Sequence, residues 1–527
     1  MQNLFKKNNR EQLVYNELYN SFYERFGCLS ASGILLRASE RFGKKEALKT
    51  ASGYSISYQD LYKSALKVSG IFSEMGVRPR DHVLLFIENS VEFYIGYWAA
   101  LLVGAVVIPV NTFLHINEVA YIIKDASPDL IIVSDRLKSV IVEAASMCDE
   151  TIQKKIFPDS ILNVSLEGFD ESTVLSHDVT GEDTAVILYT SGTTGQPKGV
   201  VLSAKNIVTN AMQAAARFQL LANEQETFFA VLPLFHAFAQ NTCIWLPAIT
   251  GSPVIVVSKI DRTAITDGLK LKPTVFLGFP ALYGLLCLMK RAPLDSVKLF
   301  ISGADAMPDK IRAAFSLLYG RKILSGYGLT EASPVVAINY LNDDRQTSNV
   351  GEPVVGIDIQ IRDDSGRVLD KGCIGTLWIK GANIMKGYYK AEQATSEAIQ
   401  SGWLCTGDIA SLSMAGEIVI HGRNKDLIIH KGFNIYPQEV ENVLLKSSLV
   451  MRAAVIGHSD DSAGEIPVAY ISLKMMKKNV EKELRQLCAA HLAAYKIPRT
   501  FIFKDDLPLS PTGKIDKKKL KNRTQNV

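Results

Sequence analysis

Short runs of β-branched and other apolar residues alternate with segments of helical periodicity along most of the chain. Residues 82–88 (HVLLFIE) and 130–134 (LIIVS) are typical of buried strands, whereas residues 58–76 show helical spacing and stop at a glycine. Residues 92–104 predict a helix in the core. This alternation predicts an α/β fold of layered sheets flanked by helices.

The length of the chain, 527 residues, indicates more than one domain. The sequence pattern changes near residues 421–437. After this point come a helical segment, two strand-like segments and a further helix around residues 480–492. We therefore predict a large N-terminal domain of layered β-sheets flanked by helices, residues 1–424, and a small α+β C-terminal domain, residues 425–527.

The charge balance excludes one class of partner. With 58 basic and 54 acidic residues, the net charge of +4 gives no concentrated basic field, so we expect no nucleic-acid partner. The basic stretch at residues 514–521 is the exception; a solvated terminus is the favoured interpretation, ahead of a membrane-surface or phosphate role. Seven scattered cysteines without a CxxC pair argue against a disulfide framework and against a zinc site.

Residues 93–117 and 227–258 contain no Asp, Glu, Lys or Arg and exceed the ~20 residues that a membrane-spanning helix needs. Glycines, prolines and polar residues interrupt both, which predicts buried helix–turn–strand units. The N-terminus lacks the apolar region of a secretory signal. We expect a cytoplasmic protein without a transmembrane span, and peripheral association with the inner membrane face stays open as an alternative.

Residues 187–200 (ILYTSGTTGQPKGV) place an apolar run before a loop of Ser, Thr and Gly that ends in a lysine. A Walker A loop requires G-x-x-x-x-G-K-[ST]. Counted from Gly192, the second glycine position holds Pro197, and Lys198 is followed by Gly199, so the loop is not a Walker A loop. Its hydroxyls and approachable backbone N–H groups still suit phosphate, and a Gly/Thr-rich surface turn is the alternative.

This loop closely resembles the signature loop of the adenylate-forming (AMP-binding) superfamily, which includes acyl-CoA synthetases, luciferases and adenylation domains. Six further motifs continue the resemblance in order over nearly the whole chain: LPLFHAFAQ (232–240), SGADAMP (302–308), GYGLTEASPV (326–335), GWLCTGDIA (402–410), GRNKDLIIHKGFNIYPQEVE (422–441) and LPLSPTGKID (507–516). Among its members, the chain looks most like medium- or long-chain fatty acyl-CoA or acyl-ACP synthetases.

The resemblance implies a reaction in two halves. A carboxylate attacks the α-phosphate of ATP, with Mg²⁺ as cofactor, and gives an acyl-adenylate and pyrophosphate; a thiol then displaces AMP. It also implies a mobile small domain that rotates about a hinge at Lys425. In one orientation this domain would present Lys514, and in the other the thiol-channel residues Lys431 and Gly432.

The resemblance also implies roles for individual residues. Lys514 would bridge the carboxylate and the α-phosphate, Thr330 would contact the α-phosphate, and Glu331 would coordinate Mg²⁺. His236 would lie at the acyl pocket near the incoming thiol. The nucleotide-binding residues would be, in chain order, Thr190, Ser191, Gly192, Thr193, Thr194, Gly195 and Lys198 for the phosphates, Gly303, Ala304, Tyr327 and Gly328 for adenine, and Asp408 and Arg423 for the ribose.

The substrate prediction rests on residue types around the expected acyl pocket. Relatives that activate amino acids carry an aspartate where this chain has His236, so an amino acid is not expected. Residues 235–247 and 275–286 are apolar and contain no Arg, Lys or Asp, and Gly278, Ala281 and Gly303 are expected to leave room. An apolar slot gains roughly 0.8 kcal/mol per buried CH₂, which favours a medium- or long-chain fatty acid, with an aryl acid as the rival.

Coenzyme A is the expected acceptor, and the phosphopantetheine of an acyl carrier protein is the alternative. The chain departs from the family at Gly375–Thr376–Leu377, where G-E-L is usual, and we expect only a local structural change there. Cys243 and Cys405 are expected to be packing residues. A non-catalytic binding relative is disfavoured because the acidic and basic site residues are all present, and a luciferase-like oxygenase is a second alternative.

Overall fold

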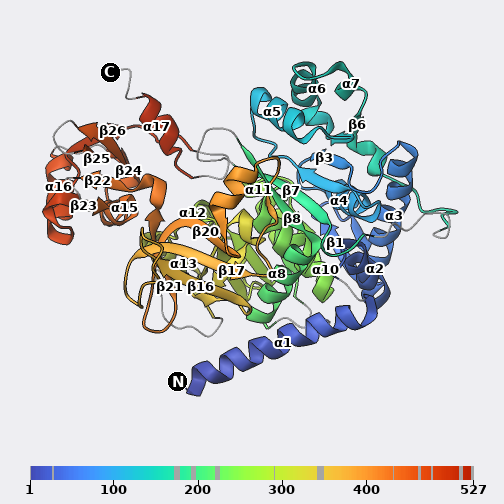
Figure 1. The fold of residues 1–527 in the computed structure, drawn as a ribbon, viewed down its shortest axis with the longest axis horizontal. Helices are drawn as coiled ribbons and strands as arrows, with labels where there is room; N and C mark the ends of the chain where they lie inside the picture. The colour runs from blue at the N-terminus through green and yellow to red at the C-terminus, as the bar shows by residue number, and fades with distance from the viewer. Residues whose placement is uncertain are drawn as a thin grey trace.

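The computed structural model describes residues 2–26, 29–170, 179–190, 197–219, 226–289, 291–340, 349–430, 433–460, 464–475, 479–509 and 514–523. They form a large body of sheets and helices and a smaller domain at the C-terminal end, which lies to one side beside α12 (Pro280–Met289) and α13 (Asp309–Tyr319) (Figure 1). The predicted α/β class and the division into a large N-terminal and a small C-terminal domain are confirmed.

One sheet of the large domain has seven strands, in the order β18-β8-β7-β4-β3-β5-β6. Its bounds are β18 (Gly387–Tyr388), β8 (Lys198–Ser203), β7 (Thr184–Thr190), β4 (Val106–Pro109), β3 (His82–Phe86), β5 (Leu130–Val133) and β6 (Ile156–Pro158). The strands from β7 to β6 run parallel, whereas β8 pairs antiparallel with both β7 and β18. The two predicted strands are confirmed as β3 and β5.

The position of strand β3 between two layers of helices explains why the strands of this sheet are unbroken apolar runs in the sequence. Val83 and Leu85 belong to one core cluster with helices α3 (Tyr58–Glu74) and α4 (Val91–Leu102). Leu84 and Phe86 belong to a second cluster under α5 (Ile116–Ala126) and α6 (Lys138–Ser146). Successive side chains of a strand point to opposite faces. Because both faces are covered by helices, Val83 to Phe86 are all buried, and only His82 at the start of the strand is partly exposed.

The second sheet of the large domain has nine strands, in the order β15-β14-β13-β12-β11-β9-β10-β1-β2. Its bounds are β15 (Glu352–Pro353), β14 (Val335–Ile338), β13 (Leu324–Gly328), β12 (Leu299–Ser302), β11 (Val275–Gly278), β9 (Phe228–Ala230), β10 (Val254–Val256), β1 (Glu46–Thr50) and β2 (Ser55–Ser57). The strands from β13 to β1 are parallel, and the antiparallel strand β14 folds back on β13.

A third, antiparallel sheet completes the large domain. It contains β16 (Ile357–Arg362), β17 (Gly375–Gly381), β20 (Trp403–Leu412) and β19 (Ile399–Gln400), and β21 (Ile418–Arg423) pairs with β20. Gly375–Thr376–Leu377, the departure from the family pattern, lies in β17, where Thr376 pairs with both Arg362 and Ile409. The pairing with β16 is regular through the triplet, whereas the register with β20 shifts between Thr376 and Trp378, so a local irregularity does fall there.

The small domain has its own sheet, formed by β23 (Phe433–Ile435), β22 (Ile428–His430), β25 (Gly464–Leu473) and β24 (Val450–Asp460), with β26 (Thr500–Lys504) beside β25. Helices α15 (Pro437–Leu445) and α16 (Val480–His491) cover one face, and α17 (Lys517–Arg523) contributes Leu520 to a separate cluster. The helices and strands predicted after residue 437 are confirmed.

The remaining helices lie around and between the sheets of the large domain. They are α1 (Gln2–Phe26), α2 (Ala31–Phe42), α3 (Tyr58–Glu74), α4 (Val91–Leu102), α5 (Ile116–Ala126), α6 (Lys138–Ser146), α7 (Glu150–Gln153), α8 (Ala204–Arg217), α9 (Ala237–Gln240), α10 (Leu246–Thr250), α11 (Arg262–Leu269) and α14 (Glu392–Ala398), with a π-helical turn (Asn241–Trp245) between α9 and α10. The predicted helices at residues 58–76 and 92–104 are α3 and α4.

The long uncharged stretches fold as predicted into helix–turn–strand units. Residues 93–117 contain most of α4 together with β4, and residues 227–258 contain β9, α9, α10 and β10. Across the part of the chain that the structure describes, no helix combines the length and apolarity needed to cross a bilayer.

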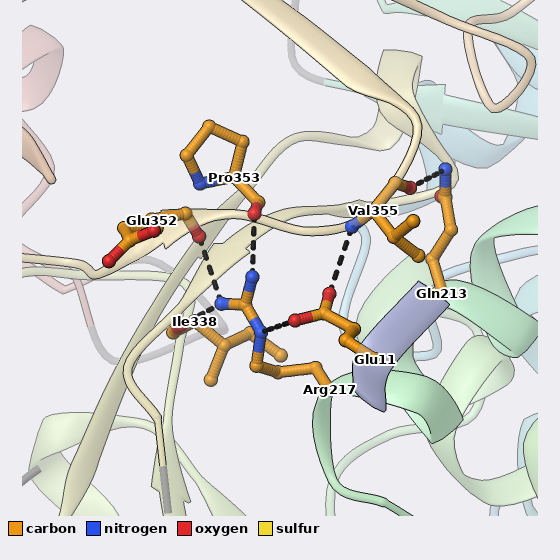
Figure 2. Close-up of polar contacts among 7 residues, drawn as sticks. All are labelled: Glu11, Gln213, Arg217, Ile338, Glu352, Pro353 and Val355. Atoms are coloured by element: carbon orange, nitrogen blue, oxygen red, sulfur yellow. Dashed lines mark hydrogen bonds and ion pairs between the residues drawn. The ribbon is translucent and has the colours of Figure 1, made fainter. Parts of the chain in front are cut away.

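Helix α1 runs along one side of the large domain and is tied to it by a buried ion pair (Figures 1 and 2). Val14, Leu18 and Phe22 are buried at helical spacing. Glu11 Oε2 lies 2.9 Å from Nε of Arg217, and Oε1 accepts the N–H of Val355 at 2.9 Å. Arg217 also donates to the carbonyls of Ile338, Glu352 and Pro353, so one guanidinium joins α1, α8 and strands β14 and β15 (Figure 2).

Candidate active site

A buried carboxylate joins two of the three sheets of the large domain. Asp408, in β20, has a side chain only 5% exposed. Its Oδ2 accepts the hydroxyl of Tyr327 at 2.5 Å, and its Oδ1 lies 2.9 Å from Nε of Arg423. Each carboxylate oxygen can accept further hydrogen bonds. The predicted ribose residues Asp408 and Arg423 and the predicted adenine residue Tyr327 are therefore in direct contact.

Strand pairing explains how these residues meet. Asp408 lies directly opposite Arg423 in the β20–β21 ladder, although 15 positions separate them in the chain numbering (423 − 408). Tyr327 comes from β13 of the nine-stranded sheet. Burial, and then the negative charge of Asp408, raise the pKa of Tyr327, so the phenol stays protonated and donates.

A second carboxylate, Glu331, lies in the short 3₁₀ turn Thr330–Ala332 directly after β13. Its Oε1 accepts the hydroxyl of Tyr388 at 3.0 Å, and its carbonyl accepts the N–H of Met385 at 2.9 Å. Burial and the Glu331 charge raise the pKa of Tyr388, which keeps this phenol a donor. Thr330 and Glu331 thus present a hydroxyl and an oriented carboxylate side by side.

The glycines of the predicted adenine slot approach other groups closely. A side chain at Gly328 would place its Cβ 2.0 Å from the carbonyl oxygen of Pro334, so only glycine fits there. At Gly303 a Cβ would lie 3.2 Å from the ring of Phe238. Ala304, which follows, has a φ of 69°. The expectation that Gly303 and Gly278 leave open room is not met, because the rings of Phe238 and Tyr283 lie against them.

The predicted phosphate loop joins β7 to β8. Thr190, at the end of β7, pairs with Lys198 at the start of β8, and Nζ of Lys198 lies 5.1 Å from the ring centroid of Tyr388. Tyr388 thus lies between the Lys198 ammonium and the Glu331 carboxylate. The loop residues Ser191, Gly192, Thr193, Thr194 and Gly195 lie outside the described residues, and their phosphate role stays a prediction.

His236 precedes α9 and is held as a neutral imidazole. Its Nε2 is buried without a hydrogen-bond partner. Burial lowers the pKa of His236 to about 4, and the positive charge of Lys514 contributes to the lowering. Lys514 of the small domain is therefore close enough to His236 to act on it electrostatically, as the predicted sharing of one site requires.

The predicted hinge, Lys425, lies in the 3₁₀ turn Asn424–Asp426 between β21 of the large domain and β22 of the small domain. Its position between the two sheets fits a hinge, and the role stays a prediction. The predicted thiol-channel residues Lys431 and Gly432 lie outside the described residues.

Two site residues were missed at the level of sequence. Tyr388 stands 57 positions from Glu331, and Phe238 stands far from Gly303 in the chain. The sequence signal for Tyr388 was its place in an aromatic stretch (GYYK) that follows the segment forming β17. The pairing of β18 with β8 brings Tyr388 to the site. That pairing cannot be deduced from periodicity.

Mg²⁺ requires hard oxygen ligands, which Glu331 and Thr330 supply. Among the described residues, no three His, Cys, Asp or Glu side chains are grouped to hold a metal ion by themselves. Mg²⁺ is usually bound by one or two carboxylates together with substrate phosphates and water. Glu331 beside the Thr330 hydroxyl fits that pattern.

The cysteines near the motifs behave as packing residues. Cys243 is buried, and burial raises the pKa of its thiol to about 12. Burial also raises the pKa of Cys405. Neither thiol is activated, in agreement with the expectation that Cys243 and Cys405 are packing residues.

Comparison with known proteins identifies the class of this site. Residues 35–389 match the family of AMP-binding enzymes, and residues 439–514 match the AMP-binding enzyme C-terminal domain. The chain belongs to this adenylate-forming family, and the resemblance predicted from the sequence motifs is confirmed.

Individual relatives agree over nearly the full length. A long-chain-fatty-acid–CoA ligase of Bacillus subtilis is 30% identical, with 94% of both chains covered. The crystal structure of ATP-bound MatB from Rhodopseudomonas palustris is similar with a TM-score of 0.86 at 28% identity, covering 94% of this chain and 99% of that one. The anthranilate–CoA ligase AuaEII in complex with anthranoyl-AMP gives a TM-score of 0.86 at 25% identity, covering 94% and 97%. The predicted enzyme class, an AMP-forming acid–thiol ligase, is confirmed.

Proposed function

We propose that this enzyme activates a medium- or long-chain fatty acid with ATP and transfers the acyl group to coenzyme A. The observation that carries the proposal is the convergence of Asp408, Arg423 and Tyr327 with Glu331 and Tyr388 in one site of an AMP-binding enzyme. This site contains side chains suited to bind ribose, phosphate and a metal ion.

In the proposed binding mode, the ribose hydroxyls of ATP donate to Asp408. Tyr327 and Arg423 hold this carboxylate by a hydrogen bond and an ion pair, so its remaining acceptor positions are oriented before ATP binds. Adenine would lie along the backbone of Gly303, Ala304 and Gly328. Thr190, the loop that follows it and Lys198 would hold the phosphates.

Catalysis of the first half-reaction requires two anions to approach each other. A carboxylate oxygen of the fatty acid attacks the α-phosphorus, the bond between the α-phosphorus and the bridging oxygen breaks, and pyrophosphate leaves. Lys514 would place its positive charge between the two reacting groups, with Thr330 on an α-phosphate oxygen. Bound Mg²⁺ would neutralise phosphate charge at Glu331, whose orientation is set by Tyr388.

The second half-reaction transfers the acyl group. The thiol sulfur attacks the acyl carbonyl carbon, the bond from that carbon to the phosphate oxygen breaks, AMP leaves, and the thiol proton passes to solvent or a nearby base. We assign no base to this step, because the pKa of the buried His236, lowered to about 4, makes its imidazole a weak base at neutral pH. Rotation of the small domain about Lys425 would remove Lys514 and open the thiol path.

A fatty acyl substrate is supported by the apolar walls and by the named relative. The rings of Phe238 and Tyr283 pack against Gly303 and Gly278, and no charged side chain occurs in residues 275–286. The similar Bacillus subtilis protein is named a long-chain-fatty-acid–CoA ligase. The likeness to an anthranilate–CoA ligase keeps an aryl acid as the second candidate.

Product analysis tests both the acid and the acceptor. Purified enzyme would receive ATP, Mg²⁺ and one acid at a time, either a fatty acid from acetate to stearate or benzoate or anthranilate, with coenzyme A and a phosphopantetheinylated carrier protein in parallel reactions. We expect an acyl-CoA thioester and AMP, with the rate highest for medium or long chains. Thioester on the carrier protein alone would overturn the acceptor, and turnover only with benzoate or anthranilate would overturn the acid.

A further inference from the structure

Asn241 joins two parts of the site that lie far apart in the sequence. Its Nδ2 donates to the carbonyl of Ser333 at 2.9 Å, across 92 positions of the chain. Ser333 is the C-terminal cap of the short turn Thr330–Ala332. Asn241 begins the π-helical turn directly after α9, the helix that His236 precedes. One amide therefore anchors the turn with the candidate metal and phosphate ligands to the segment that carries His236.

A second buried asparagine orients Asn241. The same Nδ2 donates to Oδ1 of Asn210 in α8 at 3.2 Å. Asn210 bonds both backbone groups of Val335, accepting the N–H at 2.8 Å and donating to the carbonyl at 2.7 Å. Asn241 and Asn210 are 1% and 0% exposed, so a lost partner would leave a buried polar group unpaired. Asn210 thus fixes the start of β14, directly after the turn that Asn241 holds.

Asn210 belongs to a polar stripe along α8. Four buried polar residues lie at helical spacing on one face of this helix: Asn206, Asn210, Gln213 and Arg217. Each donates a hydrogen bond to a backbone carbonyl between residues 335 and 382. Burying polar groups costs free energy unless they are paired. The stripe therefore indicates a scaffold for the backbone that follows the turn.

We propose that Asn241, supported by Asn210, is a positioning residue that holds the Thr330–Glu331 turn in the geometry that binds Mg²⁺ and the phosphates of ATP. This inference rests on the proposed function. Tyr388 orients the side chain of Glu331, whereas Asn241 holds the backbone from which that side chain extends. A turn without this anchor would shift, and the metal and phosphate contacts would weaken.

Nucleotide binding tests the proposal in Asn241→Leu, which keeps the approximate size of the side chain and removes its donor. The probe is α,β-methylene-ATP with Mg²⁺, which cannot form an adenylate, and calorimetry measures its affinity. We expect this affinity to fall about 3- to 10-fold, the effect of one or two lost hydrogen bonds. Affinity for adenosine, which carries no phosphate, should stay within about twofold. Asn241→Ala, the second variant should the first fail to fold, lets water reach the Ser333 carbonyl and should show a smaller loss for the analogue alone.

A double-mutant cycle identifies the residue through which Asn241 acts. In a Glu331→Gln background, Asn241→Leu should weaken binding of the Mg²⁺-bound analogue by less than about twofold further, because the carboxylate that it positions is already gone. In an Asp408→Asn background the full loss should recur, since Asp408 lies in β20 and not in the turn.

The matched control is Thr250→Val in α10. Its hydroxyl is also fully buried and donates to the carbonyl of Leu246 in the same helix at 3.0 Å. This variant should lower the unfolding temperature and leave the affinities for the analogue and for adenosine unchanged.

Equal losses for the analogue and adenosine in the Asn241 variants, an unchanged analogue affinity, or a full further loss in the Glu331→Gln background would overturn the proposal. A wild-type enzyme that does not bind the analogue would overturn the proposed nucleotide site together with this inference. A wild-type enzyme that binds the analogue but shows no exchange with any fatty acid would overturn the proposed substrate alone, because the binding assay contains no acid.

Discussion

At the scale of single residues, the site works by orienting charges that would otherwise be mobile. Asp408 has both oxygens engaged, one by Tyr327 and one by Arg423, yet each oxygen keeps capacity for a further hydrogen bond. Glu331 is oriented in the same manner by Tyr388. A phenol whose pKa is raised by burial is a dependable donor to such carboxylates at neutral pH.

Asp408→Asn should weaken ATP binding more than it slows turnover. The amide cannot accept on both sides, and hydrogen bonds to a charged group contribute about 1.5–3 kcal/mol each. We expect the KM for ATP to rise about 10- to 100-fold. Steady-state kinetics with varied ATP check this.

Asp363→Asn is the matched control for Asp408→Asn. It removes a carboxylate that pairs with Arg367 in an exposed turn, so the KM for ATP should not change. An unaltered KM in Asp408→Asn would contradict the proposed ribose contact.

His236 should remain neutral to below pH 5. Burial and then Lys514 lower its pKa to about 4, so protonation is favoured in the unfolded chain before it occurs in the folded one. The free energy of unfolding therefore decreases by roughly 1–3 kcal/mol as the pH falls from about 6.5 towards 4. NMR of ¹³C-labelled histidines, with the His236 signal assigned by its absence in His236→Gln, checks the titration. A midpoint near 6.5 would contradict this environment.

At the scale of elements, regular segments could be predicted and their long-range pairing could not. The sequence of β3 predicts a strand buried on both faces, and the structure shows Val83 and Leu84 in separate core clusters. Asp408 and Arg423 could be assigned because family motifs contain them. Tyr388 could not, because its position depends on β18 adding to β8. The docking of α1 rests on Glu11 and Arg217, which are 206 positions apart.

Glu11→Gln should destabilise the large domain through α1. Arg217, with a side chain 1% exposed, would keep its charge and lose its buried counter-charge, and breaking a buried pair costs about 3–5 kcal/mol. We expect a lowered unfolding temperature, measured by calorimetry, and faster proteolysis within α1.

Glu17→Gln, on an exposed face of the same helix, is the control and should change neither quantity. An unfolding temperature equal to that of the wild type in Glu11→Gln would show that α1 does not depend on the ion pair.

At the scale of the whole molecule, the relative orientation of the domains links the structure to the first half-reaction. Lys514 lies near His236, and Lys310 of α13 donates to the carbonyl of Ser447. Both relations join the small domain to the large one. The domain boundary at residues 424 and 425 falls in the turn between β21 and β22 and remains a prediction.

Lys514→Ala should separate the two half-reactions. Without the cation between carboxylate and α-phosphate, adenylate formation should fall at least about 100-fold, the effect of one lost electrostatic group in an active site. Thioester formation from supplied acyl-adenylate should be largely retained, because Lys514 serves only the first orientation. Equal losses in the two assays would refute this division of labour.

The most direct measurement of the central claim is ATP–pyrophosphate exchange with fatty acids and no thiol present. Exchange requires reversible formation of an acyl-adenylate from a carboxylate and ATP. We predict exchange that depends on a medium- or long-chain fatty acid and on Mg²⁺, and that is lost in Lys514→Ala. Exchange that appears only after coenzyme A is added, or with no fatty acid at all, would contradict the account.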